Sequence, residues 1–194
     1  MMINRLETKE QYTQCLHNAL KHLGDQLGQV ELHTPMEDLA VDCGVPLECF
    51  KAHFPSMNDL LQNIIHQMHT LFERNVQNQL VTCTFMKKKK VTYFLRCIRL
   101  FLLETPEAGF LFTLGFFGDV VVDPIYRQLE QYYDLWEDTI YECFTAVFDE
   151  PFAKSMTKQY LSLLKGRCHR TDLEGIGYAL RDAENFVSIL LKYY

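Results

Sequence analysis

Apolar residues recur every three or four positions along most of this chain, and the alternation typical of β-strands is scarce. Spacings of three and four place side chains on one face of an α-helix. The six prolines and nine glycines fall mostly at the ends of such segments. The sequence therefore predicts an all-α fold of about nine helices. The first apolar stripe consists of Tyr12, Leu16, Leu20, Leu23 and Leu27.

Helix-start signals set several of the predicted boundaries. Thr34-Pro35-Met36-Glu37 combines an N-cap threonine, a proline at the first helical position and a glutamate that closes a capping box. A short helix should start there and end at the turn Asp42–Val45, and a second should cover Pro46–Phe54. Ser56-Met57-Asn58-Asp59 repeats the capping signature and should start a long helix that runs to about Gln77.

Five more helices are predicted in the rest of the chain. They are expected over 89–104, from Thr105 onward, over 123–147, over 151–165, and from Thr171 to the end. The four lysines Lys87–Lys90 are interpreted as a solvated connector in front of the first of these helices.

Aromatic residues are distributed unevenly and indicate two modules. Residues 1–56 contain only Tyr12, Phe50 and Phe54, and all the other aromatic residues lie in 57–194. No Gly/Ser linker separates the two parts, so the boundary should lie in or beside a helix. We therefore expect a small domain over 1–56 and a larger helical domain over 57–194.

Composition narrows the class of protein. With 48% hydrophobic and 23% charged residues the chain is typical of globular proteins. No apolar stretch is long enough for a membrane span, and the N-terminus has no secretory signal pattern. The seven cysteines include no CxxC spacing, which favours free thiols in a reducing compartment. We expect a soluble, cytoplasmic protein with no membrane partner.

Two short helices joined by a turn that contains glycine form the geometry of a helix-turn-helix, whose second helix can enter a DNA major groove. The segment from Thr34 to Leu61 resembles the DNA-binding region of the TetR/AcrR family of transcriptional regulators. The matching positions are Thr34, Asp38-Leu39-Ala40, Gly44-Val45, Phe50, Phe54-Pro55-Ser56 and Asp59-Leu60-Leu61.

This resemblance implies a DNA-binding helix-turn-helix domain followed by a ligand-binding and dimerisation domain. Carried over position by position, it implies DNA contacts at Thr34, Pro46, Leu47, Glu48, Lys51, His53 and Met57.

The sequence departs from the family pattern at the positions that would approach phosphates. Lys51 stands where the pattern has a tyrosine, and Met57 stands where it has a lysine. Residues 1–56 contain four basic and eight acidic residues, which gives a net charge of −4. Because affinity for DNA depends largely on Lys and Arg that neutralise phosphates, the net charge of this module lowers its expected affinity for DNA. Either Lys51, His53 and helix N-termini suffice, or DNA binding is weak or lost.

The aromatic residues of 57–194 allow two interpretations: they fill a core, or they line an apolar cavity. The resemblance implies a pocket for a small apolar effector. Its expected lining is Tyr93, Phe94, Cys97, Phe112, Phe116, Tyr133 and Trp136.

The resemblance also implies a homodimer in which the last two helices pack against those of a partner. Small and apolar residues on these helices allow close approach. The expected interface is Phe152, Met156, Tyr160, Ala179, Ala183, Phe186 and Val187.

Sequence signatures of enzymes are missing: there is no phosphate loop, dinucleotide fingerprint, GxSxG or HExxH. His66, His69 and Glu73 have a spacing that a metal could use, but a polar helix face is the better interpretation. We therefore expect no enzyme activity, cofactor or metal.

These observations lead to one main hypothesis, a ligand-responsive repressor that binds palindromic operator DNA as a homodimer. The alternative is a TetR-like regulator with weakened DNA binding that acts through a protein partner. A third hypothesis is a small-molecule carrier or sensor that uses only the helical body.

Overall fold

The computed structural model describes residues 9–26, 35–83, 86–105, 108, 111, 123–167 and 173–193. All regular elements within these ranges are helices, so the predicted all-α fold is confirmed. They are α1 (Lys9–Gln26), α2 (Met36–Asp42), α3 (Leu47–His53), α4 (Met57–Phe72), the π-helix η2 (Glu73–Gln77), α5 (Asn78–Val81), α6 (Lys87–Glu104), α8 (Asp123–Thr145), α9 (Glu150–Arg167) and α10 (Leu173–Tyr193).

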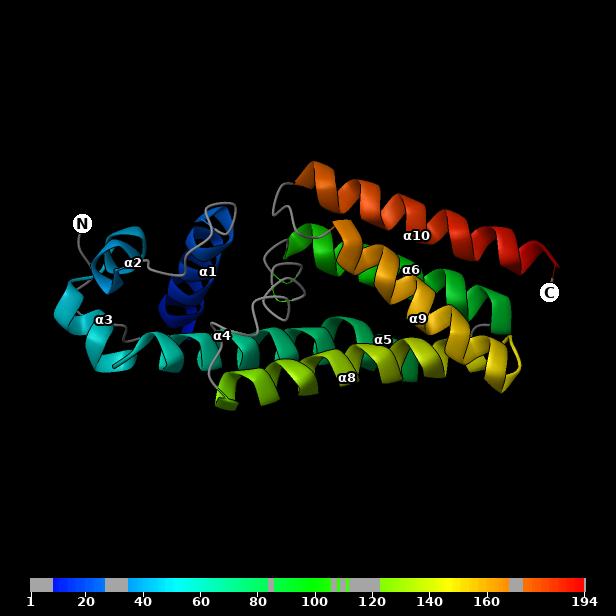
Figure 1. The fold of residues 1–194 in the computed structure, drawn as a ribbon, viewed down its shortest axis with the longest axis horizontal. Coiled ribbons are helices and arrows are strands. Elements are labelled where there is room, and N and C mark those ends of the chain that lie inside the picture. The colour runs from blue at the N-terminus through cyan, green and yellow to red at the C-terminus, as the bar shows by residue number, and fades with distance from the viewer. Residues whose placement is uncertain are drawn as a thin grey trace.

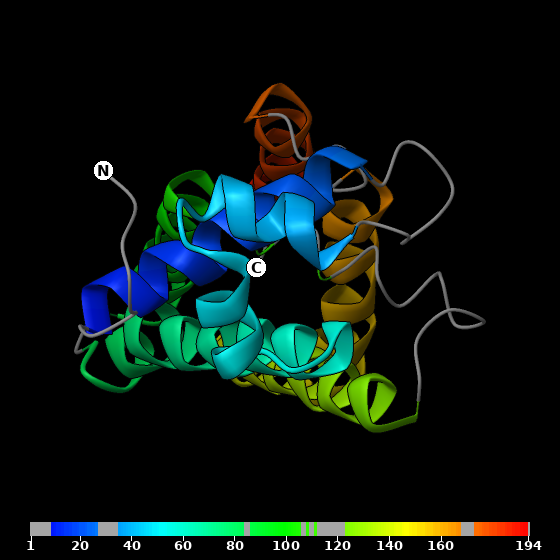
Figure 2. The same cartoon turned by 90° about the vertical axis from the view of Figure 1, so that its left-hand side faces the viewer.

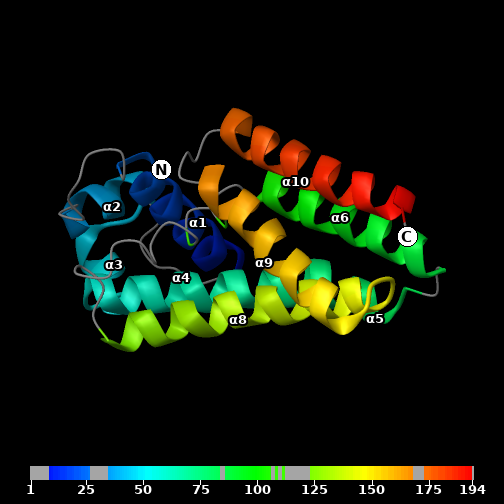
Figure 3. The same cartoon turned by 45° about the vertical axis from the view of Figure 1, so that its right-hand side comes forward.

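The helices form a small unit, α1 to α3, at one end of a larger helical body (Figure 1). The helix α4 leaves the small unit and runs beside α8, while α9 packs against both α8 and α10, and α6 packs against α10 (Figures 1 and 3). Seen from the end of the small unit, α1, α2 and α3 lie in front of the body helices (Figure 2). Among the described helices, none combines the length and apolar character that crossing a membrane requires.

The turn between α2 and α3 forms as predicted, and its hydrogen bonds show why. Gly44 has φ of +67°, a left-handed conformation that favours glycine. The Gly44 N–H donates to the Val41 carbonyl at 2.9 Å, and the Val45 N–H donates to the Ala40 carbonyl at 3.1 Å. This pair of bonds is a Schellman motif, which satisfies the last carbonyls of α2 and reverses the chain.

The predicted cap of α4 is confirmed, and the predicted starts of α2 and α3 are each wrong by one residue. Ser56 caps α4 as predicted, since its Oγ accepts a hydrogen bond from the Asp59 N–H at 3.2 Å. The predicted start of α2 is wrong by one residue, because Pro35 is extended at ψ 141° and only its carbonyl accepts helical bonds. Pro46 occupies the same position before α3. A proline fixes φ near −65°, which suits an N-cap as well as the first helical position. Thr34 lies outside the described residues.

The helix predicted from Ser56 to about Gln77 runs further, to Val81, with the π-helix η2 inside it. The interpretation of Lys87–Lys90 as a connector is wrong, because these lysines form the first turn of α6. Lysine is a good helix former, and Lys87, Lys88 and Lys89 are exposed to solvent in this turn. Lys88 Nζ also donates to the Leu191 carbonyl at 3.1 Å and so joins α6 to the end of α10.

Candidate nucleic-acid interface

One buried side chain anchors the second helix of the helix-turn-helix, α3. Phe50 is fully buried, and its ring lies 5.1 Å from that of Phe54. On the opposite side of α3, Glu48, Lys51 and Ala52 are exposed to solvent. The arrangement therefore presents a short polar helix face at one end of the molecule, as a DNA reader requires.

Lys51 is the only Lys or Arg on α3, and it already has an acidic partner. Its Nζ lies 3.2 Å from Glu37 Oε1 on α2, and both side chains are about half exposed. A hydrogen bond from the backbone N–H of Glu37 lowers the pKa of its carboxyl, and Lys51 lowers it further. An exposed ion pair of this kind contributes little to stability. Lys51 can therefore exchange Glu37 for another anion at small cost.

The structure separates the residues expected to contact DNA into two groups. Glu48, Lys51 and His53 are exposed, and the His53 ring lies 6.2 Å from that of Tyr12. Leu47 and Met57 are partly buried and pack against the core. Pro46 is half-buried at the start of α3. The last three positions thus also serve packing, and a DNA-contact role for any residue in the set stays a prediction.

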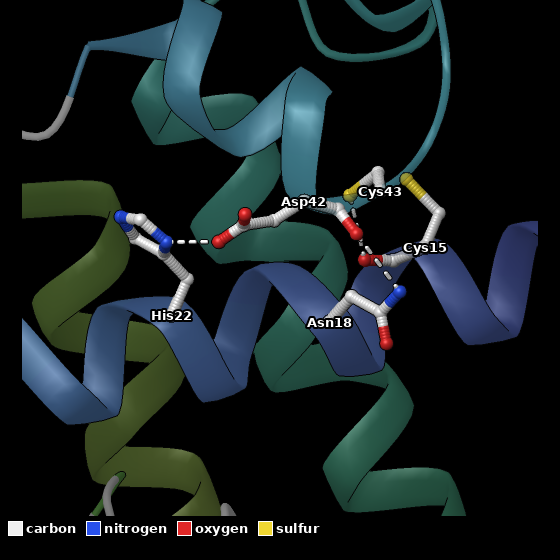
Figure 4. Close-up of polar contacts among 5 residues, drawn as sticks. All are labelled: Cys15, Asn18, His22, Asp42 and Cys43. Carbon is white, nitrogen blue, oxygen red and sulfur yellow. Dashed lines mark hydrogen bonds and ion pairs between the residues drawn. The ribbon is translucent and has the colours of Figure 1, made fainter. Parts of the chain in front are cut away.

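Polar side chains on α1 fix the helix-turn-helix, and no sequence pattern predicted their contacts. The Tyr12 hydroxyl donates to Asn63 Oδ1 on α4 at 2.7 Å. Asn18 Nδ2 donates to the Asp42 carbonyl at 3.2 Å, and the His22 ring forms a hydrogen bond with the Asp42 carboxylate (Figure 4). These contacts hold α1 against α4 and against the end of α2. In the sequence they are ordinary polar residues of an amphipathic helix, with no signal that marks their partners.

The fold matches solved structures, although no protein-family model and no curated protein matches the sequence. It is similar to AibR, whose crystal structure is a complex with isovaleryl coenzyme A and operator DNA, with a TM-score of 0.69 and 14% identity over 92% of this chain and 97% of AibR. It is also similar to a TetR transcriptional regulator from Legionella pneumophila, with a TM-score of 0.71 and 18% identity over 97% of this chain and 99% of that one. This chain has the TetR fold. The resemblance seen in the helix-turn-helix is confirmed, and it extends through the helical body.

Within the body of this TetR-like chain, two residues expected to line the effector pocket belong to the core. Phe94 and Trp136 are fully buried, and the Trp136 ring lies 4.2 Å from that of Phe72 on α4. Cys97 is buried as well, and burial raises the pKa of its thiol. These residues pack between the helices, as expected if the aromatic residues fill a core.

The other expected pocket residues lie nearer the surface or outside the described ranges. Tyr93 donates a hydrogen bond to Gln79 Oε1 at 3.2 Å. The Tyr133 hydroxyl donates to the Leu111 carbonyl, and Lys165 Nζ lies 4.5 Å from the centre of the Tyr133 ring. Phe112 and Phe116 lie outside the described residues. The set as a whole does not line one described cavity.

A polar hollow of about 330 Å³ lies between α4 and α8. Gln128 Oε1 is buried there and has no hydrogen-bond partner. His69 Nδ1 lies 3.6 Å from Glu73 Oε1, so these two groups already interact. Among the described residues, no three His, Cys, Asp or Glu side chains are placed to hold a metal ion. The hollow is lined by Ile65, His66, His69, Thr70, Glu73, Gln128 and Gln131.

Most residues expected at a dimer interface are buried within the single chain. Five of the seven have almost no exposed surface, and Phe152 and Phe186 are partly buried. The small residues on α10 therefore allow close packing of helices within one chain. On the same helix, Tyr178 and Ile189 are exposed. The five buried residues are Met156, Tyr160, Ala179, Ala183 and Val187.

Proposed function

We propose that this chain is a ligand-responsive transcriptional regulator, a repressor that binds operator DNA through α3. The observation that carries the proposal is the α2–α3 unit, whose Schellman turn at Gly44 presents an exposed helix face at one end of the molecule. The similarity to AibR, solved with operator DNA and isovaleryl coenzyme A, supports the same class of function.

DNA binding would use Lys51 as its main phosphate contact on α3. In the free chain Lys51 pairs with Glu37 at 3.2 Å. A DNA phosphate would replace the Glu37 carboxylate as the partner of Lys51, and it would benefit from release of condensed counterions. The exposed Glu48 on the same helix opposes this approach, so we expect modest affinity that depends on salt.

The effector is proposed to bind in the body beside α4, because α4 links the helix-turn-helix to the other helices. The hollow between α4 and α8 is polar, and the buried Gln128 Oε1 needs a hydrogen-bond donor. An effector that bears an N–H or O–H group fits these residues better than a purely apolar one. Its binding would change how α4 packs on α8 and so reorient α3. In this scheme 1–56 acts as the DNA-binding domain and 57–194 as the ligand-binding and dimerisation domain.

A homodimer is proposed through the surfaces of α9 and α10 that the chain itself leaves uncovered. Phe152 and Phe186 are partly buried, and Tyr178 and Ile189 are exposed. Two copies related by a two-fold axis would present two α3 helices to successive half-sites of palindromic DNA.

The test is selection from a pool of random duplexes at low and moderate salt. The wild-type chain should enrich a palindrome, and Lys51→Ala should weaken binding by about 1 kcal/mol or more. Lys89→Ala is the matched control, since it removes the same charge from an exposed position on α6. Equal loss in both variants would contradict the assignment of α3 as the DNA-binding helix.

One observation favours a second candidate, a regulator that acts through a protein partner. Residues 1–56 carry a net charge of −4, and the single cation of α3 is paired with Glu37. If no duplex is enriched even at low salt, this acidic end of the molecule would instead be expected to bind a basic protein surface.

A further inference from the structure

Two cysteines distant in the sequence meet inside the helix-turn-helix module. Cys15 lies on α1, and Cys43 is the C-cap residue directly after α2. The Cys43 thiol donates to the Cys15 carbonyl oxygen at 3.2 Å across a separation of 28 residues. Figure 4 shows the two sulfur atoms next to each other, and the two thiols interact directly. Neither side chain is used by the proposed function.

Flanking contacts hold the two thiols in place. Asn18 Nδ2 donates to the Asp42 carbonyl, and His22 pairs with the Asp42 carboxylate, so α1 is tied to the residue directly before Cys43 (Figure 4). On the other side of Cys43, Gly44 has a left-handed backbone that fixes the direction of the chain. These contacts on both sides of Cys43 therefore keep its sulfur atom close to that of Cys15.

The two thiols differ in their readiness to ionise. The interaction of the Cys43 side chain with the Cys15 sulfur lowers the pKa of Cys15, because it stabilises a thiolate there. The same interaction and burial raise the pKa of Cys43. A low-pKa thiol beside a second thiol is the arrangement of a redox-active pair. By contrast, burial raises the pKa of Cys143 in the body.

We propose that Cys15 and Cys43 are a modification site, a dithiol that a hydroperoxide oxidises to a reversible disulfide. The Cys15 thiolate attacks one oxygen of hydrogen peroxide, the O–O bond breaks, and the leaving hydroxide takes up a proton as water. The resulting Cys15 sulfenic acid is attacked by the Cys43 sulfur, so that the S–S bond forms and the S–O bond breaks. The second leaving hydroxide takes the Cys43 proton. Two thiols and one peroxide thus give one disulfide and two waters.

Access of the oxidant depends on local opening, since Cys15 is 2% and Cys43 is 8% exposed. The helices α2 and α3 have seven residues each, and short units of this size open at a free energy below that of global unfolding. Hydrogen peroxide is small enough to use such an opening.

The disulfide would tie α1 to the turn that directs α3. Because the sulfur atoms are already adjacent, oxidation should lock the module in the arrangement seen here rather than distort it. A cross-link across this loop lowers the entropy of the unfolded chain. We expect the midpoint of thermal unfolding to rise by roughly 5–15 °C and to return when the disulfide is reduced.

The experiment treats the full-length reduced protein with hydrogen peroxide and maps its disulfides by mass spectrometry. Combined digestion after lysine and glutamate separates Cys15, Cys43 and Cys49 onto three peptides, because Lys21, Glu37 and Glu48 lie between or beside them. We expect a cross-linked Cys15–Cys43 peptide, sensitive to dithiothreitol, and the loss of two titratable thiols per chain.

Cys15→Ser and Cys43→Ser should each abolish this peptide and the thermal shift, whereas Cys83→Ser, which alters a half-buried thiol in the body, should retain both. A wild-type chain that keeps both thiols reduced, or pairs either one with a different cysteine, would overturn the proposal. Peptide mapping of the wild type decides the matter even if a serine variant does not fold. The result is independent of DNA binding.

Discussion

Replacing Gly44 by alanine should lower the free energy of unfolding through backbone conformation alone. Gly44 has φ of +67°, and a Cβ placed there would meet no atom within 4 Å beyond its chain neighbours. Gly44→Ala therefore adds no clash, but it forces an L-residue into the left-handed region, at a cost of about 1–2 kcal/mol. That is a rise of roughly 5- to 30-fold in the unfolding equilibrium constant.

Gly177→Ala is the matched control for this prediction. Gly177 lies within α10, and a Cβ there would also meet nothing within 4 Å. Its backbone is helical, so alanine should stabilise the chain by about 1 kcal/mol through higher helix propensity. The same chemical change in equally open space should thus have opposite signs at the two sites.

The measurement is urea unfolding followed by far-ultraviolet circular dichroism. The midpoint should fall for Gly44→Ala and rise for Gly177→Ala, while the slope of free energy against urea stays unchanged. If Gly44→Ala is as stable as the wild type, the Schellman turn is not under the conformational constraint described here. Repeating the titration at two protein concentrations separates folding of the chain from dissociation of a dimer.

Three further predictions test the interface and the core. Glu37→Gln should release Lys51 and strengthen DNA binding about two- to fivefold at low salt in a fluorescence titration; unchanged or weaker binding would contradict the exchange of partners. Ser56→Ala should lower the free energy of unfolding by about 1 kcal/mol through loss of the N-cap, whereas the exposed Ser188→Ala should change it by less than about 0.5 kcal/mol. Burial lowers the pKa of Lys165, so the unfolded chain binds the proton more tightly and stability should rise as the pH approaches the ordinary lysine pKa. Lys165→Met should reduce that rise, and an identical pH slope in both proteins would refute it.

Local chemistry made the helix-turn-helix predictable. Gly44 marks the end of α2 because its left-handed backbone completes the Schellman bonds, and Ser56 marks the start of α4 because its Oγ accepts the Asp59 N–H. Pro35 and Pro46 were placed one residue too far into their helices. Their fixed φ fits both positions, and only ψ, which the sequence does not specify, separates them.

Tertiary neighbours explain the residues that the sequence assigned less well. A period of 3.6 marks which face of α10 is covered, but it does not say whether a helix of the same chain or of a partner covers it. Ala179 and Ala183 are covered by the same chain. An apolar residue such as Trp136 suits both a core and a pocket. Its contact with Phe72 places it in the core. The pairing of Asn18 with Asp42 likewise needs the fold.

The position of Met57 in the structure explains one departure from the family pattern. Met57 stands where the pattern has a phosphate-binding lysine, and it is partly buried against the core. The methionine side chain thus contributes to packing, whereas the lysine of the pattern contacts a phosphate. Each phosphate contact changes the logarithmic salt dependence of binding by about 0.9. With Lys51 as the single Lys or Arg on α3, this chain should show a shallower salt dependence than a reader that also has the lysine. Met57→Lys should therefore steepen the slope by about one, and an unchanged slope would show that this end of α4 does not approach DNA.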